Sequence, residues 1–345
     1  MSAFTTVADP TAPLRVVLVG AGLMGRAWMR TIDESPDAEL VGVVDLDEAF
    51  ATSSLAAVGF TGIPVGTSLA ELAERTSADA VVNVTSPAAH LPVSLEALRA
   101  GLPVLCEKPV AESVAQASLM AAAAAEAGRL LMVGQNRRFR TGIRELRAHV
   151  AHLGEVGSIV VEFFKEAHFP GFREEMDHVL LLDMAIHHFD AARFVLDSDP
   201  VAVYCRETNP GWSWFADGAN ATAVFEFEGG TTFTYSGSWC SPGQETSWNA
   251  HWRVNGERGV AIWDGEGSPE VDYSGEEEPT GLEERPEDLA GVLAEFIASL
   301  RTGETPATEV HANIPSLAMV EAAILSAETG SRVLIADVLG RLSPT

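Results

Sequence analysis

Lys108 stands where a functional side chain is expected in an α/β fold. It follows a short apolar run, Leu102–Leu105, within the segment Cys106-Glu107-Lys108-Pro109. The carboxyl ends of parallel strands form the edge at which open α/β sheets bind ligands. An ammonium group at that edge can donate a hydrogen bond to a substrate oxygen, although a single lysine there is more often a solvated strand end.

A second group, Asp183, His187 and Asp190, lies in the apolar segment His178–Leu196. Apolar residues surround the segment on nearly every side, which predicts a buried helix. Positions three and four apart share a helix face, so the three polar side chains form one stripe, and His188 points about 100° away from it. Burying unpaired polar groups is costly, so the stripe is either hydrogen-bonded or functional.

Three interpretations of this stripe stay open from the residues alone. Asp183 and His187 can form a structural pair. The spacing D-x-x-x-H-x-x-D can belong to a metal site, but no second cluster in the sequence completes one, so no metal is expected. Histidine also titrates near neutral pH, which suits proton transfer with a substrate, and a carboxylate one turn away can fix its tautomer.

Gly20, Gly22 and Gly25 form the pattern G-x-G-x-x-G directly after the apolar run Leu14–Val19. A strand before the glycines and a helix after them is the context that a dinucleotide fingerprint requires. We expect Gly20 to make the tight turn, Gly22 to let the backbone approach a pyrophosphate, and Gly25 to let the helix pack on the strand. The start of that helix, Leu23-Met24, offers N–H groups to the phosphates.

Asp45 ends the next apolar run, Leu40–Val44. A carboxylate in this place accepts hydrogen bonds from the adenosine ribose hydroxyls, and its charge repels the 2′-phosphate that distinguishes NADP. The first part of the chain is therefore predicted to bind NAD in preference to NADP.

The order of the elements predicts two domains. Apolar strands alternate with helices over Leu14–Val133, which is typical of a doubly wound parallel sheet with right-handed crossovers. From Gly157 the strands are longer and alternate in polarity, and turns such as Asn255-Gly256 separate them, which indicates a largely antiparallel open sheet. We predict an α/β protein with a Rossmann domain over residues 1–134 and an α+β domain over residues 135–345.

Composition excludes several classes of partner. The 345 residues include 49 acidic and 22 basic ones, for a net charge of −27. Nucleic acids and anionic membranes both bind basic surfaces, so neither is expected as a partner. No leader-like N-terminus or long uncharged apolar run is present. The cysteines Cys106, Cys205 and Cys240 have neither zinc-site nor disulfide spacing, and we expect a cytoplasmic protein.

With these residues in hand, nearly the whole chain resembles the Gfo/Idh/MocA family of oxidoreductases, named for glucose–fructose oxidoreductase and inositol dehydrogenase. The glycine pattern and Asp45 fit this family, and the most specific match is Ala100–Pro109 with its Glu-Lys-Pro ending. Further similar segments are Thr85–His90, Gly134–Phe139 and Asp183–Asp190.

The resemblance implies roles for individual residues. Lys108, Asp183 and His187 would be the catalytic triad of hydride transfer between a secondary alcohol and nicotinamide. His187 would take the hydroxyl proton, Lys108 would stabilise the charge that develops on the oxygen, and Asp183 would orient substrate or lysine. Ala185 replaces the family's usual glycine, which bears on substrate class more than on chemistry. The further cofactor contacts would be Thr85, Ser86, His90, Glu107, Gln135 and Lys108 itself.

The substrate contacts are predicted from residue type. Aromatic faces stack on sugars, but each aromatic side chain of the second domain is more often core or interface packing. Within this group Trp239 is a candidate substrate contact, and Arg138 is a candidate polar one. The resemblance also implies that the second domain binds the substrate and joins copies of the chain into a homodimer or homotetramer.

These observations favour an NAD-dependent dehydrogenase that oxidises a secondary hydroxyl of a sugar, anhydrosugar, inositol or other polyol. Two alternatives remain. One is a redox-neutral glycosidase or lyase that oxidises a sugar transiently, eliminates a substituent and regenerates NAD. The other is a non-catalytic dinucleotide-binding sensor, against which the presence of Lys108, Asp183 and His187 argues.

Overall fold

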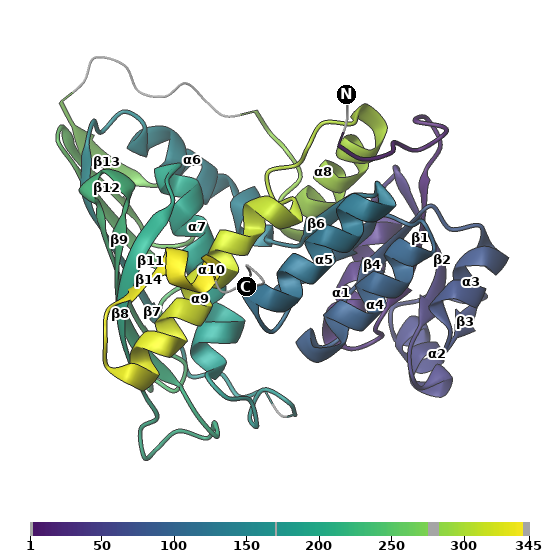
Figure 1. Ribbon diagram of the computed structural model, residues 1–345, viewed down its shortest axis with the longest axis horizontal. Helices are drawn as coiled ribbons and strands as arrows, with labels where there is room; N and C mark the ends of the chain where they lie inside the picture. The colour runs from purple at the N-terminus through teal and green to yellow at the C-terminus, as the bar shows by residue number, and fades with distance from the viewer. Residues whose placement is uncertain (1–2, 170, 275–282, 341–345) are drawn as a thin grey trace. The chain divides into compact units, whose positions relative to one another are not determined.

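The computed structural model describes residues 3–169, 171–274 and 283–340, and the chain divides into two compact units (Figure 1). Unit 1 consists of Met1–Asn136 with Arg285–Ile314, and unit 2 consists of Arg137–Glu284 with Pro315–Thr345.

The predicted division into domains differs from these units in one respect. The boundary after Gly134 lies beside the observed one after Asn136, but Arg285–Ile314 returns to unit 1 instead of belonging to the second domain. A backbone hydrogen bond of 2.9 Å from Val133 N–H to Thr308 C=O is one of the contacts that hold it there. Pairing between segments so far apart leaves no local pattern in the sequence.

Unit 1 is built on a parallel sheet. Its strands are β1 (Leu14–Val19), β2 (Ala38–Val44), β3 (Val65–Gly66), β4 (Ala80–Asn83), β5 (Val104–Cys106) and β6 (Leu131–Val133). Within the described residues they form a six-stranded sheet in the order β3-β2-β1-β4-β5-β6, with every pair parallel. This is the doubly wound order of dinucleotide-binding domains. The central strands are covered on both faces, which explains their nearly unbroken apolar runs.

The helices of unit 1 cover this sheet. They are α1 (Leu23–Glu34), α2 (Glu48–Ala57), α3 (Leu69–Thr76), α4 (Pro87–Arg99), α5 (Val114–Ala127) and α8 (Asp288–Thr302). One group consists of α3, α4 and α5 in contact, and another of α1 with α2 and α8. Right-handed crossovers place the two groups on opposite faces. Local signals set several starts, since Asp47, Ser68 and Ser113 cap α2, α3 and α5.

Unit 2 is built on a mixed sheet. Its strands are β7 (Val156–Phe164), β8 (Pro200–Thr208), β9 (Asn220–Phe227), β10 (Thr232–Ser238), β11 (His251–Gly256), β12 (Gly259–Trp263), β13 (Glu270–Tyr273) and β14 (Val333–Leu334). The described residues form an eight-stranded sheet in the order β13-β12-β11-β7-β10-β9-β8-β14. Neighbours are antiparallel except β7 and β10. The predicted fold class, a parallel Rossmann sheet followed by a largely antiparallel one, is confirmed.

Helical segments cover one face of this second sheet (Figure 1). They are α6 (Thr141–Val150), η2 (Leu180–Ala185), α7 (Ile186–Leu196), the main part of α9 (Val310–Thr329) and α10 (Ile335–Gly340). The short 3₁₀ turns are η1 (Asn136–Phe139) and η3 (Glu228–Gly230). The outer face exposes apolar side chains, including Val201, Tyr204 and Val224.

The predicted continuous α-helix over His178–Leu196 is wrong at its start. His178 lies outside the regular helix with φ of +51°, Leu180–Ala185 forms the π-helix η2, and α7 begins only at Ile186. A π-helix has a wider turn than an α-helix and occurs frequently at functional sites. Asp183 and His187 would share one helix face at 3.6 residues per turn, but η2 does not have this geometry.

One helix in the described part of the chain, α9, is long and apolar enough to cross a membrane by length and composition alone. Of its most apolar window, 56% is buried inside the structure. The core helix of a soluble protein passes the same test, so α9 is weak evidence for a membrane span.

Candidate functional site

The glycine turn after β1 is shaped by two of its three glycines. Gly20 has φ of +103°, and a Cβ there would lie 2.8 Å from the Val84 carbonyl oxygen. A Cβ on Gly25 would lie 2.1 Å from the Gly20 carbonyl oxygen. A Cβ on Gly22 would meet no described atom within 4 Å. The fold therefore requires Gly20 and Gly25, whereas the space beside Gly22 is open to a ligand.

This difference predicts opposite effects for two alanine variants. Gly25→Ala should destabilise the protein by at least about 1–3 kcal/mol, because the new methyl group overlaps backbone. Gly22→Ala should leave the free energy of unfolding unchanged and weaken dinucleotide binding, because the methyl group occupies the approach to the phosphates. Urea unfolding and fluorescence titration with NAD measure the two effects. Unchanged NAD affinity in Gly22→Ala would contradict this assignment of the turn.

Asp45 is bound to the glycine turn. Its carboxylate accepts a hydrogen bond of 2.8 Å from Ala21 N–H and one of 3.2 Å from Asp47 N–H. The side chain is half-buried, and the next residue, Leu46, is 97% exposed. Asp45 is therefore fixed at the carboxyl edge of the sheet, where the predicted ribose contact requires it.

His90 lies in α4 and contacts the segments that follow β4 and β5. It is 1% exposed, with Nδ1 2.7 Å from the Pro109 carbonyl oxygen and Nε2 3.0 Å from the Thr85 carbonyl oxygen. Burial lowers the pKa of His90. The ring thus links the loop after β4, which includes Ser86, to the segment that follows Lys108, so it positions both loops.

Asn83 is a residue that motif reasoning missed. Its amide donates to the His90 carbonyl and to Ser94 Oγ, each at 3.1 Å, and its Oδ1 accepts from Thr85 Oγ1 at 2.7 Å. Asn83 fixes the loop that carries two predicted cofactor contacts. An asparagine inside an apolar strand was the available signal, because such a buried amide needs partners.

Glu107 is buried beside Lys108. Its two carboxylate oxygens accept hydrogen bonds from Trp28 Nε1–H at 2.8 Å and from Lys108 N–H at 3.1 Å. Burial raises the pKa of Glu107. The carboxyl group joins α1 to the end of β5 and fixes the backbone from which the Lys108 side chain starts.

Gln135 follows β6 at the same carboxyl edge of the sheet. It is 1% exposed, and neither its amide nitrogen nor its amide oxygen has a hydrogen-bond partner in the described residues. A buried amide without partners is costly. The orphaned amide and the open space at Gly22 both fit a bound dinucleotide.

Asp183 in unit 2 is paired with an arginine that sequence reasoning missed. Asp183 is 6% exposed, and Arg173 Nε–H donates to its Oδ2 at 2.5 Å. The Arg173 guanidinium also lies over the rings of Phe169 and Phe172. Arg173 lies in an irregular loop without a recognisable motif. The available signal was its positive charge, which a buried acid needs in a partner.

Asp190 forms a buried ion pair with Arg138. Arg138 donates from Nε to Oδ2 and from Nη2 to Oδ1, each at 2.7 Å, and Ser316 Oγ–H donates to Oδ1 at 2.7 Å. Asp190 is 1% exposed. The predicted substrate contact through Arg138 gains no support, because the planar fork of the guanidinium faces Asp190.

The interpretation of Asp183, His187 and Asp190 as a metal site also loses support, because the two carboxylates are already paired. Both carboxylates have arginine partners, and a cation between them would have to displace these hydrogen bonds. His187 is 5% exposed and borders a small cavity with Arg137 and Asn249.

His188 and Trp239 belong to the aromatic core of unit 2. The His188 ring lies 5.0 Å from Phe163 and 5.6 Å from Tyr235, and burial lowers its pKa to about 3. Trp239 is 1% exposed and stacks on Phe215 at 5.4 Å. Such burial favours packing as the role of Trp239, and substrate contact there stays a prediction.

Two family models match the chain, one in each unit. Residues 14–135 match the model described as "Oxidoreductase family, NAD-binding Rossmann fold". Residues 143–262 match the "GFO/IDH/MocA C-terminal domain". Together the two matches include well over half of the chain.

Individual proteins are also similar to this chain. The chain is 35% identical to inositol 2-dehydrogenase 4 of Saccharopolyspora erythraea over 198 residues. This alignment covers 56% of this chain and 57% of that protein. It is 28% identical to 1,5-anhydro-D-fructose reductase of Ensifer adhaerens over 68% of this chain and 72% of that protein.

A solved structure shows the same fold over almost the whole chain. The oxidoreductase from Agrobacterium radiobacter, in complex with NAD+, L-tartaric acid and magnesium, superimposes with a TM-score of 0.83. The alignment covers 95% of this chain and 100% of that one at 22% identity. At this identity the likeness establishes the fold alone.

Proposed function

Because the chain belongs to the Gfo/Idh/MocA family of oxidoreductases, we propose that it is an NAD-dependent dehydrogenase that oxidises a secondary hydroxyl of a sugar, anhydrosugar or inositol. The observation that carries this proposal is the glycine turn, open at Gly22 and joined to Asp45, in a chain that also has Lys108 and His187. Family relatives named as inositol dehydrogenase and anhydrofructose reductase support the substrate class.

The residues of unit 1 would hold the cofactor. The phosphates would lie against the backbone at Gly22 and the start of α1, where Leu23 and Met24 are 64% and 36% exposed. Asp45 would accept from the ribose hydroxyls, and the orphaned Gln135 amide would gain partners. When bound, NAD supplies the carbon that accepts the hydride.

The side chains of the protein would contribute a proton transfer and the stabilisation of a developing negative charge. His187 would take the proton of the substrate hydroxyl, and Lys108 would donate a hydrogen bond to the same oxygen as it becomes a carbonyl. Asp183 would orient the substrate or Lys108, and its hydrogen bond from Arg173 would hold the carboxylate in place.

Cofactor choice can be tested through charge alone. Asp45→Asn retains an oxygen that can accept from Ala21 N–H, but it loses the negative charge. We expect its preference for NAD over NADP to fall by about 10–100-fold, the size of a lost charged hydrogen bond and a removed repulsion. The matched control is Asp47→Asn, which removes a charge two residues away and preserves the cap of α2. Equal effects in both variants would contradict a specific role of Asp45.

The outer face of the second sheet supports association of copies of this chain. Val201, Tyr204 and Val224 are exposed on strands β8 and β9, and exposed apolar residues together favour an interface. We therefore propose that the chain forms a homodimer or homotetramer. Light scattering on the purified protein measures the mass of the assembly and tests this. The cytoplasmic location stays a prediction from the sequence.

The proposal is tested by following NADH at 340 nm with a panel of sugars, anhydrosugars and inositols. A substrate that reduces NAD, with the signal lost in Lys108→Ala, is the expected result. Cleaved products without net NADH would instead favour the redox-neutral glycosidase or lyase. Biological activity that persists in Lys108→Ala and His187→Ala would favour the sensor.

A further inference from the structure

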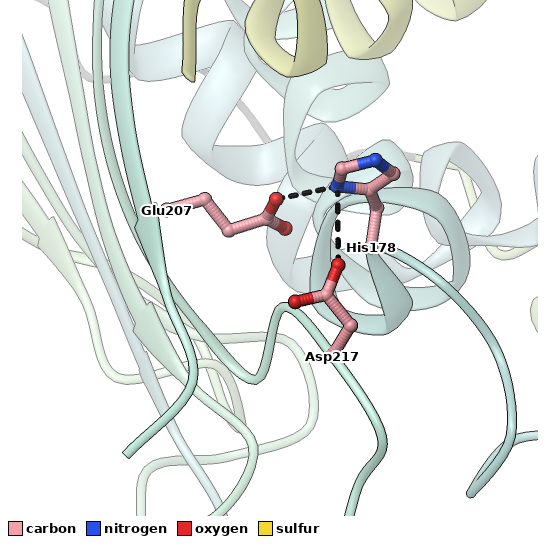
Figure 2. Close-up of side chains that lie close together, drawn as sticks. All are labelled: His178, Glu207 and Asp217. Atoms are coloured by element: carbon pink, nitrogen blue, oxygen red, sulfur yellow. Dashed lines mark hydrogen bonds and ion pairs between the residues drawn. The ribbon is translucent and has the colours of Figure 1, made fainter. Parts of the chain in front are cut away.

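His178, Glu207 and Asp217 come together in unit 2 from three places in the chain. His178 lies two residues before the start of η2, Glu207 lies near the end of β8, and Asp217 lies in the connection between β8 and β9. Within the described ranges they form a group of metal-ligand type whose ligand atoms all lie within 4.8 Å of one another. Figure 2 shows both carboxylates directed at the same ring nitrogen of His178.

The distances in this group suit a small cation. His178 Nδ1 and Glu207 Oε2 are hydrogen-bonded at 2.5 Å, a contact that a metal ion would replace, and Nδ1 lies 3.9 Å from Asp217 Oδ2. Ligand atoms at about 2.0–2.2 Å from a tetrahedral metal ion are separated from one another by roughly 3.3–3.6 Å. The observed distances lie on either side of this range, so side-chain movements of about 1 Å would bring the three groups to one ion.

One oxygen of the group has no hydrogen-bond partner among the residues that the structure describes. The Glu207 side chain is 8% exposed, and its Oε1 atom accepts no hydrogen bond from the described residues. Leaving a buried carboxylate oxygen unpaired is costly. A cation bound at the group would provide the missing partner.

The backbone permits this close approach. Gly218 has φ of +59°, and a Cβ there would lie 2.5 Å from Glu207 Oε1 and 2.7 Å from His178 Cα. Any side chain at this position would separate the two ligands. Glycine is thus the residue that lets Glu207 and His178 meet.

The surroundings provide an orienting group and an entry path. Glu328 Oε1 lies 3.9 Å from Nε2, the other ring nitrogen of His178. This distance is too long for a hydrogen bond, but a side-chain rotation that shortened it by about 1 Å would let Nε2–H donate to Glu328, as histidines that bind metal commonly do. The side chains of Asp217 and Glu328 are 48% and 58% exposed, so an ion can enter from solvent.

We propose that His178, Glu207 and Asp217 bind one divalent transition-metal ion, Zn²⁺ or Mn²⁺, which fixes the start of η2. One imidazole and two carboxylates are a donor set that suits these ions. The Leu182 N–H donates to the His178 carbonyl at 3.0 Å, and the Leu180 N–H donates to the Gly218 carbonyl at 3.1 Å. A metal here would therefore hold the turn that carries Asp183.

Metal content and binding test the site. Full-length protein without an affinity tag is analysed by mass spectrometry for metals, stripped with EDTA, and titrated calorimetrically with ZnCl₂ and with MnCl₂. We expect about one ion per chain, and at least about a tenfold loss of affinity in Glu207→Gln and Asp217→Asn. Asp217 is half-exposed, so its variant should fold even if the Glu207 variant does not.

The matched control is His311→Asn, which removes an exposed histidine that lies 2.8 Å from Glu309. It should bind metal like the unaltered protein. Absence of binding, or equal binding in Asp217→Asn, would show that the group is an ion pair without a metal and would overturn the proposal. Hydrogen exchange tests the second part, because metal should slow exchange at Leu180 and Leu182. Binding without that protection would overturn the role at η2.

Discussion

His187→Asn is expected to lower kcat by about 10²–10⁴-fold and to leave the affinity for NAD unchanged. The size is that of removing a general base from a proton transfer. NAD affinity should persist because the predicted cofactor residues lie in unit 1 and His187 lies in unit 2. Steady-state kinetics at 340 nm and a fluorescence titration with NAD measure the two quantities.

The pH dependence separates catalysis from structure. A general base must be unprotonated to take the substrate proton, so kcat of the unaltered enzyme should fall at low pH. The variant should lack this acidic limb of the pH profile. His188→Gln is the control, because His188 lies in the aromatic core and its pKa of about 3 keeps it neutral. That variant should lose stability and keep the limb. A His187→Asn enzyme with the limb intact would mean that His187 is structural.

Arg138→Ala is expected to reduce the free energy of unfolding by about 3–5 kcal/mol. Asp190 is 1% exposed, and removing its guanidinium partner would leave a buried charge with too few hydrogen bonds. The Arg138 side chain is itself only 10% exposed, so solvent screens the pair little. Urea unfolding followed by tryptophan fluorescence measures the change.

A second bidentate pair in unit 2 supplies the control. Arg332 donates to Glu226 through Nε and Nη2, but both side chains are about half-exposed, so Arg332→Ala should change stability little. The same experiment tests the sequence-based assignment of Arg138 to the substrate. If Arg138→Ala raised KM without loss of stability, that assignment would be correct and the structural one wrong.

The dinucleotide-binding half of the protein is largely determined by local sequence. Gly20, Gly25 and Asp45 act through the residues beside them and through strands that neighbour each other in the sheet, so spacing alone predicts the turn and the bound carboxylate. The alternation of strands and helices likewise predicts the parallel sheet, because right-handed crossovers leave few other arrangements. Motif spacing also marked Lys108 and His187 as candidates.

Only the tertiary structure decided which polar side chains are partners. Asp183 and Asp190 look alike in one segment of sequence, yet Arg173 pairs with the first and Arg138 with the second. The sequence pattern could not predict these pairs, because partners that come from loops and distant helices leave no periodic signal in the sequence. The same reason hid the return of Arg285–Ile314 to unit 1.

The group of His178, Glu207 and Asp217 shows the same limit most clearly. Each residue taken alone has an ordinary solvated interpretation, and their separations match no metal-site spacing. They meet because β8 brings Glu207 back beside His178, two residues before η2, and because Gly218 has no side chain to keep them apart. Sequence determined the residue types, and chain folding over long separations decided which of them meet.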